Sequence, residues 1–485
     1  MTLSDLFSNL NAILPLAVLV AWTCGLLLVD LFIPHERKEW TAILAGMGLI
    51  LSLGLAISRS GQYQLAFSGM VSVDGFSLFL NVVFLVSGLV GVIIAHDYLK
   101  RLDMERGEYY ILLLFSVCGM MLMSMAADLI VIFLALEWLS FPLYIMAGIA
   151  RFRQNSEEAA LKYFLLGAFA GGFVVYGTAL VFGATGTTGL AGVVNAINGG
   201  SANIPLLTVG AGLVLIGLGF KVSAVPFHMW TPDVYQGAPT AVTAFMSVGA
   251  KAGGFAALLR IFTAALPALS GDITTVMWGL AALTMFIGNV VAIAQSNIKR
   301  MLAYSSIAHA GYILIALVSF GQAKVAGDAV AAALFYLLAY GFTSFGAWSV
   351  VMELERDEEK GLELADYAGL GRKYPALAAA MTVFMLSFTG VPPTLGFIGK
   401  FYIFRTAIEG GFIGLALIGV LTSLVSAYYY LRVVVIMYMR DGEPEVRGTT
   451  ILHLTVYTSA LAVVILSLLS GPLLNWAAQA MLAKF

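Results

Sequence analysis

Apolar runs of roughly 20 residues recur from one end of this 485-residue chain to the other. That is the length a helix needs to cross the hydrocarbon core of a bilayer. Hydrophobic residues make up 60% of the sequence and charged residues only 11%, whereas soluble domains carry about 25% charged residues. The sequence therefore predicts an all-α, polytopic membrane protein.

The length criterion predicts about fourteen transmembrane helices. Their approximate cores are 11–33, 40–58, 75–96, 109–127, 129–150, 161–184, 205–227, 240–263, 273–295, 301–320, 327–351, 375–404, 411–438 and 451–473. The loops between them are short, and no soluble domain is inserted. The longest polar stretch, residues 353–373, carries both charge signs and is expected to be a solvated connector.

The loop charges predict the orientation of the chain. Positive residues gather in the loops that follow odd-numbered spans, namely Arg37, Lys38, Lys100, Arg101, Arg106, Arg151, Arg153, Lys299, Arg300, Arg356, Lys360, Arg372, Lys373, Arg440 and Arg447. The other loops hold little beyond Arg59 and Lys324. Because positive loops stay cytoplasmic, both termini are expected on the non-cytoplasmic side. The first ten residues lack a basic stretch, so the first apolar run is expected to be a retained helix.

Composition also argues against several kinds of partner and site. The two cysteines, Cys24 and Cys118, both lie in apolar runs, and no Cys/His cluster accompanies them. A zinc or iron–sulfur site in this chain is therefore not expected. The net charge of −2 argues against nucleic acid as a partner.

Four ionisable residues fall well inside apolar runs. They are Glu137 in VIFLALEWLSFPLYIM, Lys221 in GLGFKVSAVPFHMW, Lys251 in FMSVGAKAGGFAALL and Lys400 in LGFIGKFYIF. A charge at the bilayer centre costs about 2.5–3.5 kcal/mol on insertion scales, so four cost roughly 10 kcal/mol or more before any pairing. That sum is comparable to the net stability of a whole domain. We expect these charges to be paired, hydrated or both, and to have a function.

Helix breakers accompany two of the four charges. In the seventh span, Pro226 lacks the N–H that would bond to the carbonyl four residues back. In the twelfth, Pro392 and Pro393 free the carbonyls of Phe388 and Thr389. Broken helices beside ionisable groups mark ion sites in transporters, and the alternative is a simple packing kink. We expect both spans to be broken.

A lone histidine in AYSSIAHAGYIL is a further candidate. His309 has Ser305, Ser306 and Tyr312 on neighbouring helical turns. The pattern is compatible with a proton wire and equally with a satisfied core histidine.

The remaining polar residues have simpler interpretations. Arg260 and Arg405 suit interfacial anchors, and Asp30 and Asp74 lie near span ends, where they are expected to face water. Glu158 and Lys162 are spaced for a surface salt bridge. His228 and Asp233, in FHMWTPDVY, belong either to a functional loop or to an ordinary interfacial turn.

Five stretches between residues 137 and 402 together resemble one family. They are EWLSFPLYIMAG, EEAALKYFLLGAFAGGF, GFKVSAVPFHMWTPDVYQGAPT, KRMLAYSSIAHAGYIL and GVPPTLGFIGKFY. The combination resembles the antiporter-like membrane subunits of respiratory complex I. Among the sister subunits, which are the L, M and N types, it is most similar to the N type. The L type usually carries a long lateral helix at its C-terminus, whereas this chain ends soon after its fourteenth span. Lys400 stands where the M type usually has Glu, and Val234-Tyr235 stands where the L and M types usually have a second His.

The resemblance implies a more detailed fold. Residues 1–485 would form a single integral membrane domain. It would hold two inverted five-helix repeats, 106–264 and 270–440, with the seventh and twelfth spans broken. A three-helix segment, 1–105, would precede the repeats, and a C-terminal helix, 441–485, would follow them.

The resemblance also implies residue roles and partners. Glu137 would pair with Lys221, Lys251 would be the central relay, and His309 would help connect Lys251 to Lys400 near the exit. No cofactor is expected in this chain, because FMN, iron–sulfur clusters and the quinone site would belong to partner subunits. The partners would be the other membrane and peripheral subunits of complex I and the lipid bilayer of the bacterial cell (inner) membrane.

The leading hypothesis is a membrane subunit that translocates protons while partner subunits transfer electrons from NADH to quinone. The alternative is a subunit of a multisubunit sodium/proton antiporter, which shares these motifs. A third possibility is a structural scaffold whose buried ion pairs are inert.

Overall fold

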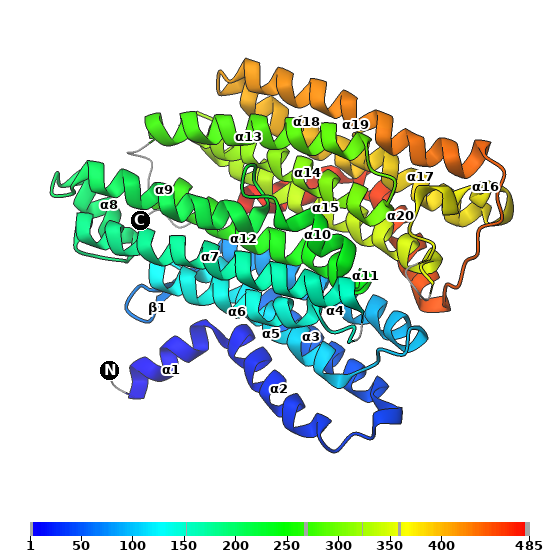
Figure 1. Cartoon of the computed structure of the whole chain (residues 1–485). Coiled ribbons are helices and arrows are strands. Elements are labelled where there is room, and N and C mark those ends of the chain that lie inside the picture. Colours follow the sequence, from blue (N-terminus) through cyan, green and yellow to red (C-terminus); the bar gives the residue numbers. More distant parts are fainter. Residues whose placement is uncertain (1–2, 152, 266–269, 323, 357–359, 481–485) are drawn as a thin grey trace.

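A computed structural model describes residues 3–151, 153–265, 270–322, 324–356 and 360–480. The axes of the long helices lie roughly parallel to one another, with the N-terminal helices at one edge of the molecule and α19 at the opposite edge (Figure 1). The membrane-spanning, all-α character predicted from the sequence is confirmed.

The N-terminal segment contains α1 (Leu3–Ala12), α2 (Leu14–Asp30), a short 3₁₀ turn (His35–Arg37), α3 (Glu39–Ser58) and α4 (Gly75–Arg101). The axes of α1 and α2 are bent by 84°. Between α3 and α4 lies an antiparallel hairpin of β1 (Gln64–Ala66) and β2 (Val71–Val73), in which Leu65 is opposite Ser72.

The next region consists of α5 (Gly107–Met125), α6 (Leu129–Ala147), α7 (Gln154–Thr185), α8 (Leu190–Asn198), α9 (Ile204–Val222), α10 (Trp230–Gly237), α11 (Thr240–Phe245) and α12 (Lys251–Leu259). Two π-helical segments, Met246–Ala250 and Arg260–Ala265, flank α12. The sequence did not predict the first of them, which ends directly before Lys251. Such π-helical turns are frequent at functional sites.

The remainder comprises α13 (Ser270–Ile293), α14 (Ile298–Phe320), α15 (Ala326–Leu354), a 3₁₀ turn (Leu364–Tyr367), α16 (Leu370–Lys373), α17 (Pro375–Thr389), α18 (Leu395–Glu409), α19 (Ile413–Met439), α20 (Thr450–Leu468) and α21 (Ser470–Gln479). The last five residues of the predicted C-terminal segment lie outside the described residues.

In the described part of the chain, 12 helices are long and apolar enough to cross a membrane, or up to 13 if the bent α1–α2 pair is one span. The predicted span at 375–404 is absent from that count because it is divided into α17 and α18. The predicted span at 11–33 is counted only when α1 and α2 are taken together. The difference from fourteen therefore reflects the short α2 and the broken helix.

Both predicted helix breaks are present. α9 ends at Val222, followed by Ser223 with a left-handed φ of 65°, and α10 begins at Trp230. α17 ends at Thr389, followed by Gly390 with a φ of 86°, and α18 begins at Leu395. Glycine adopts such a φ without steric cost, so the second break uses the residue type best suited to it.

The core lies around three spans, Thr240–Phe262, α14 and α15, which are almost wholly buried. By contrast, α3 and α20 expose most of their apolar residues, as expected for helices that contact lipid. The buried spans carry Lys251 and His309, so the structure places these polar groups at its centre.

The connector at residues 353–373 is largely packed, and the prediction of a solvated connector was wrong. Glu353 and Tyr367 are buried. The Ile298 N–H donates to the Leu362 carbonyl (2.8 Å), and the Leu364 N–H donates to the Ser296 carbonyl (2.8 Å). Backbone pairing with the start of α14 thus holds this polar sequence against the protein.

Candidate functional site

Lys221 is buried at the last turn of α9. Its Nζ donates to Ser140 Oγ on α6 (2.8 Å) and to the Tyr163 hydroxyl on α7 (3.0 Å). The Tyr163 ring centroid also lies 5.3 Å from Nζ. Three helices therefore meet at one ammonium group.

Glu137 lies one helical turn before Ser140, and its carboxylate faces Gly171 of α7, where an added Cβ would come within 2.6 Å of Oε1. In the described part of the chain, Glu137 and Lys221 interact electrostatically without forming an ion pair within 4.0 Å. The hydroxyls of Ser140 and Tyr163 bind the ammonium group directly, and Glu137 acts on it at longer range.

Protein groups cover the break after α9. Trp230 Nε1 donates to the Phe220 carbonyl (2.9 Å), and the Val225 N–H donates to Thr284 Oγ1 (2.9 Å). The Trp230 ring also stacks on Tyr163, with centroids 4.5 Å apart. Irregular backbone at membrane depth requires such cover, and here the covering residue contacts a ligand of Lys221.

Lys251 is buried at the start of α12. Its Nζ donates to the Ser306 carbonyl (2.5 Å) and to the Ser306 hydroxyl, and the Tyr340 ring centroid lies 6.0 Å away. Gly254, one turn further on, packs on Lys221, because an added Cβ would approach Lys221 Cγ to 3.2 Å. The Lys221 and Lys251 sites are therefore neighbours.

His309 follows Ser306 by one turn of α14. Its Nδ1 is 2.6 Å from the Tyr336 hydroxyl on α15, and its Nε2 is 3.1 Å from the Tyr430 hydroxyl on α19. Tyr430 is also hydrogen-bonded to Ser305. The hydroxyls that bind His309 belong to two tyrosines that the sequence did not single out, and not to Ser305, Ser306 or Tyr312.

Lys400 on α18 donates to the Phe388 carbonyl (2.8 Å), the Thr389 carbonyl (3.0 Å) and Ser423 Oγ (2.7 Å). The two carbonyls are those that the sequence predicted to be freed by the prolines. The Tyr312 ring centroid lies 4.6 Å from Nζ. A groove of about 710 Å³ between α18 and α19 borders Lys400.

The structure thus brings the five predicted residues to one polar region. Ser306, which binds Lys251, adjoins Ser305, which is hydrogen-bonded to Tyr430 and through it to His309. The Tyr312 ring lies next to both His309 and Lys400. Neutral groups bind all three lysines: in the described part of the chain, no carboxylate lies within ion-pair distance of their Nζ atoms. Hydroxyls and imidazole both donate and accept protons, so this arrangement can pass a proton between buried amines.

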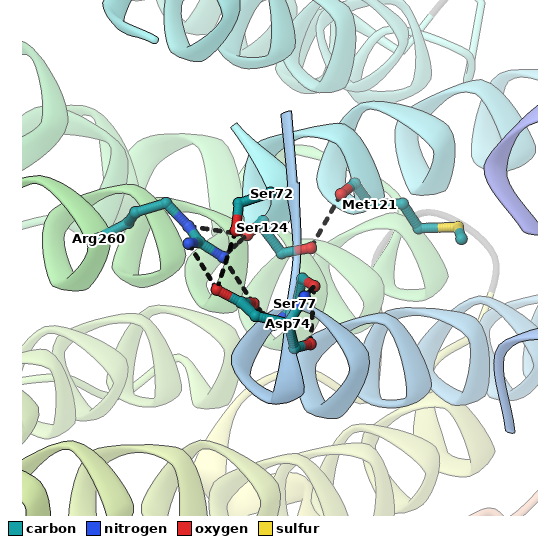
Figure 2. A network of polar contacts seen from close by, with 6 residues as sticks. All are labelled: Ser72, Asp74, Ser77, Met121, Ser124 and Arg260. Carbon is teal, nitrogen blue, oxygen red and sulfur yellow. Dashed lines mark hydrogen bonds and ion pairs between the residues drawn. The ribbon is translucent and has the colours of Figure 1, made fainter. Parts of the chain in front are cut away.

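Arg260 and Asp74 form a second buried charged site, which Figure 2 shows with its surroundings. Arg260 donates from Nη1 to Asp74 Oδ2 (2.8 Å), from Nη2 to Oδ1 (3.0 Å), and to the Ser124 carbonyl. The side chain of Arg260 is 0% exposed. Asp74 Oδ1 also accepts from the Ser77 N–H, which caps α4.

The assignments of Arg260 as an interfacial anchor and of Asp74 as water-facing were therefore wrong, because each residue supplies the buried partner of the other. Asp30 was also wrongly expected to face water. It is buried, with one oxygen 2.8 Å from Lys38 Nζ and the other 2.5 Å from Thr41 Oγ1.

Asp233 belongs to a partly exposed ion-pair cluster at the ends of α7, α10 and α14. Lys162 lies 2.7 Å from both Glu158 and Asp233, and Arg300 lies 2.8 Å from Asp233. The predicted Glu158–Lys162 pair is confirmed. Burial would raise the pKa of Asp233, but hydrogen bonds from Lys162 and Arg300 lower that pKa below its usual value. Within the described residues, no group of three or more His, Cys, Asp or Glu side chains could hold a metal ion.

Comparison with known proteins identifies similar sequences. Residues 126–426 match the family described as NADH:quinone oxidoreductase/Mrp antiporter, TM. The NADH-quinone oxidoreductase subunit N of Trichlorobacter lovleyi is 46% identical over 97% of each chain. The subunit N of Chloroflexus aggregans is 47% identical over 96% of this chain and 95% of its own.

Solved structures share the fold. A chain of respiratory complex I from Thermus thermophilus has a TM-score of 0.82 and 38% identity, over 96% of this chain and 99% of that chain. A chain of the Mrp complex from Dietzia sp. has a TM-score of 0.87 at 20% identity, over 97% of each chain. The second likeness is evidence of the fold alone.

Proposed function

We propose that this chain, which belongs to the NADH:quinone oxidoreductase/Mrp antiporter family, works as the proton-translocating N subunit of an NADH–quinone oxidoreductase. Electron transfer from NADH to quinone takes place in partner subunits, and this chain moves protons across the membrane. The observation that carries the proposal is the group of buried amines, hydroxyls and imidazole that Lys251, His309 and Lys400 form with their serine and tyrosine partners in the centre of the membrane domain.

We assign the following roles within this proposal. Lys221 receives a proton near Glu137, whose carboxylate stabilises the ammonium group electrostatically. Lys251 is the central relay, and His309 passes the proton between Lys251 and the region of Lys400. Lys400 releases it beside the groove between α18 and α19.

The fold organisation inferred from the resemblance remains part of the proposal. Two inverted repeats, 106–264 and 270–440, would each contain one broken helix, and the breaks after α9 and α17 support that division. The chain would lie in the bacterial cell membrane with its termini on the non-cytoplasmic side. FMN, iron–sulfur clusters and quinone would be bound by partner subunits.

The sodium/proton antiporter alternative is less well supported. Relatives that are 46–47% identical over nearly the whole chain are named as subunits of NADH-quinone oxidoreductase. The likeness to the Mrp complex, at 20% identity, supports a common fold without a common activity.

The proposal is tested with the purified complex reconstituted in vesicles. We expect Lys251→Ala to abolish NADH-driven proton uptake, because the central relay has no other amine at its position. Lys373→Ala removes an exposed lysine paired with Glu443 and should leave uptake unchanged. Replacement of sodium by potassium should have no effect. Wild-type proton uptake and quinone reduction in Lys251→Ala would refute the assignment.

A further inference from the structure

Glu353 is a buried carboxylate that the proposed relay does not use. It lies at the end of α15 and is 0% exposed. In the described part of the chain, neither of its oxygens accepts a hydrogen bond. Among the described residues, His453 on α20 is the charged partner within ion-pair distance, with Nδ1 3.0 Å from Oε1, and the His453 side chain is 40% exposed. An imidazole thus stands between a buried carboxylate and the solvent.

The surroundings of Glu353 leave it without a fixed donor. Arg101 on α4 interacts with Glu353 electrostatically, but its guanidinium donates to the carbonyls of Met352 (2.6 Å) and Arg447 (2.5 Å). Gly448 closes another side, because an added Cβ would lie 2.7 Å from Glu353 Oε2. The titratable and charged groups that act on this carboxylate from the neighbouring elements are Arg101, His453 and Tyr457, and Tyr98, Glu355 and Arg447 act on Arg101 in turn.

Glu355 provides an internal contrast. It is also buried, but it accepts a hydrogen bond from the Tyr98 hydroxyl (2.9 Å), which in turn accepts from the Thr240 N–H (3.0 Å). Burying a carboxylate without donors is costly. Glu355 avoids that cost through Tyr98, whereas Glu353 avoids it only when His453 is protonated or when Glu353 itself is neutral. The second arrangement is that of a site that exchanges a proton.

α15 carries buried polar side chains between this carboxylate and the central lysine. From Glu353 inward, the helix carries Ser349, Ser344 and Tyr340, all buried. Ser344 Oγ is 3.2 Å from Ser247 Oγ on the Lys251 span, and the Tyr340 ring centroid is 6.0 Å from Lys251 Nζ. At 1.5 Å per residue, Ser344 and Glu353 are roughly 14 Å apart along the helix.

We propose that His453 and Glu353 form a proton-uptake pair that loads Lys251 from the face of the membrane domain that carries the basic loops. The imidazolium of His453 gives its proton to the Glu353 carboxylate, and the neutral imidazole takes a new proton from bulk water. The neutral Glu353 then releases its proton toward Ser349 and Ser344. The proton is finally bound by the Lys251 amine. This inference rests on the proposed function of Lys251.

The competing interpretation is a purely structural ion pair that fastens α20 to α15. Both interpretations expect some loss of stability when either residue is replaced. They differ in kinetics, because only an uptake site makes turnover depend on the supply of protons. That supply falls as pH rises, so the loss of an uptake site should slow turnover most at high pH. In addition, dissolved imidazole can take over the function of an exposed histidine that has been removed.

The test uses the reconstituted complex carrying Glu353→Gln, His453→Ala or the control Glu355→Gln. Coupled NADH-driven quinone reduction is measured from about pH 6 to about pH 9, a range that spans the titration of imidazole. Both Glu353→Gln and His453→Ala should lose roughly tenfold or more in turnover at the alkaline end, in line with the contribution of a positioned acid–base group. At the acid end the loss should be small, and Glu355→Gln should show no such pH dependence.

Imidazole is then added to each variant. It should restore turnover in His453→Ala and not in Glu353→Gln, because only the first retains the buried acceptor. Deficits that are independent of pH and unaffected by imidazole would overturn the inference in favour of a structural pair. If Glu353→Gln fails to assemble, the imidazole response of His453→Ala decides the matter. Wild-type behaviour of both variants, with Lys251→Ala inactive, would reject the uptake pair and leave the proposed function intact.

Discussion

The span Thr240–Phe262 holds two buried cations, Lys251 and Arg260, which differ in whether a carboxylate compensates their charge. Lys251 begins α12, and among the described residues its Nζ donates hydrogen bonds to Ser306 and has no carboxylate within ion-pair distance. Arg260, nine residues later, forms a bidentate ion pair with Asp74. A guanidinium does not release its proton in proteins, and a paired one is fixed in place. The compensated cation therefore holds the span in place, whereas the uncompensated amine can change its protonation.

The largest effect on stability should come from Arg260→Met. It removes the guanidinium that compensates the buried Asp74 carboxylate, and breaking a buried ion pair in this way typically costs about 3–5 kcal/mol. We expect a strongly lowered thermal midpoint for the complex, measured by scanning fluorimetry. The double variant Asp74→Leu, Arg260→Met should recover much of that loss, since no charge remains unpaired. Equal midpoints for the single and double variants would contradict the idea of a compensated pair.

Lys251→Met should give the reverse signature. Removing an uncompensated buried amine relieves its desolvation, so the thermal midpoint should be unchanged or raised while proton uptake is lost. Uptake is followed with a pH-sensitive dye inside the vesicles. A variant that pumps normally, or one that loses stability as Arg260→Met does, would remove the distinction between the two cations.

Tyr430→Phe should have an intermediate effect on function. It removes the hydroxyl that links His309 to Ser305 and leaves Tyr336 as the remaining partner of the imidazole. We expect slowed proton uptake in an assembled complex, with a turnover deficit smaller than that of Lys251→Met. Tyr428→Phe, two residues away on the exposed side of α19, is the matched control.

The smallest effect on stability is expected at the partly exposed ion-pair cluster around Asp233, in contrast to the buried charges above. The pKa of Asp233 is lowered in the folded protein, so its stabilising contribution is present above the usual Asp pKa of about 4. It is lost as pH falls through the lower folded value. Thermal midpoints measured from neutral to acid pH should therefore fall less steeply in Asp233→Asn than in wild type. Identical slopes would show that the cluster contributes nothing measurable.

The sequence was most informative where the signal is local. Hydropathy located the spans, and proline chemistry located both breaks and even the two carbonyls that bind Lys400. It failed where a partner is distant. Tyr336 and Tyr430 are ordinary tyrosines in apolar helices, and only the packing of α14 against α15 and α19 turns their hydroxyls toward His309.

From the sequence alone it followed that the chain spans a membrane, where its helices break, and that Lys221, Lys251 and Lys400 are buried, but not that Asp74, Arg260 and Glu353 are. The tertiary structure decided how each charge is compensated. Asp74 and Arg260 are 186 residues apart in the sequence. Glu353 belongs to a polar stretch of sequence, yet it is buried and contacts His453 of α20. Local composition fixes the preference of a segment for lipid or water, but compensation of a charge depends on contacts between segments, which arise only when the helices pack.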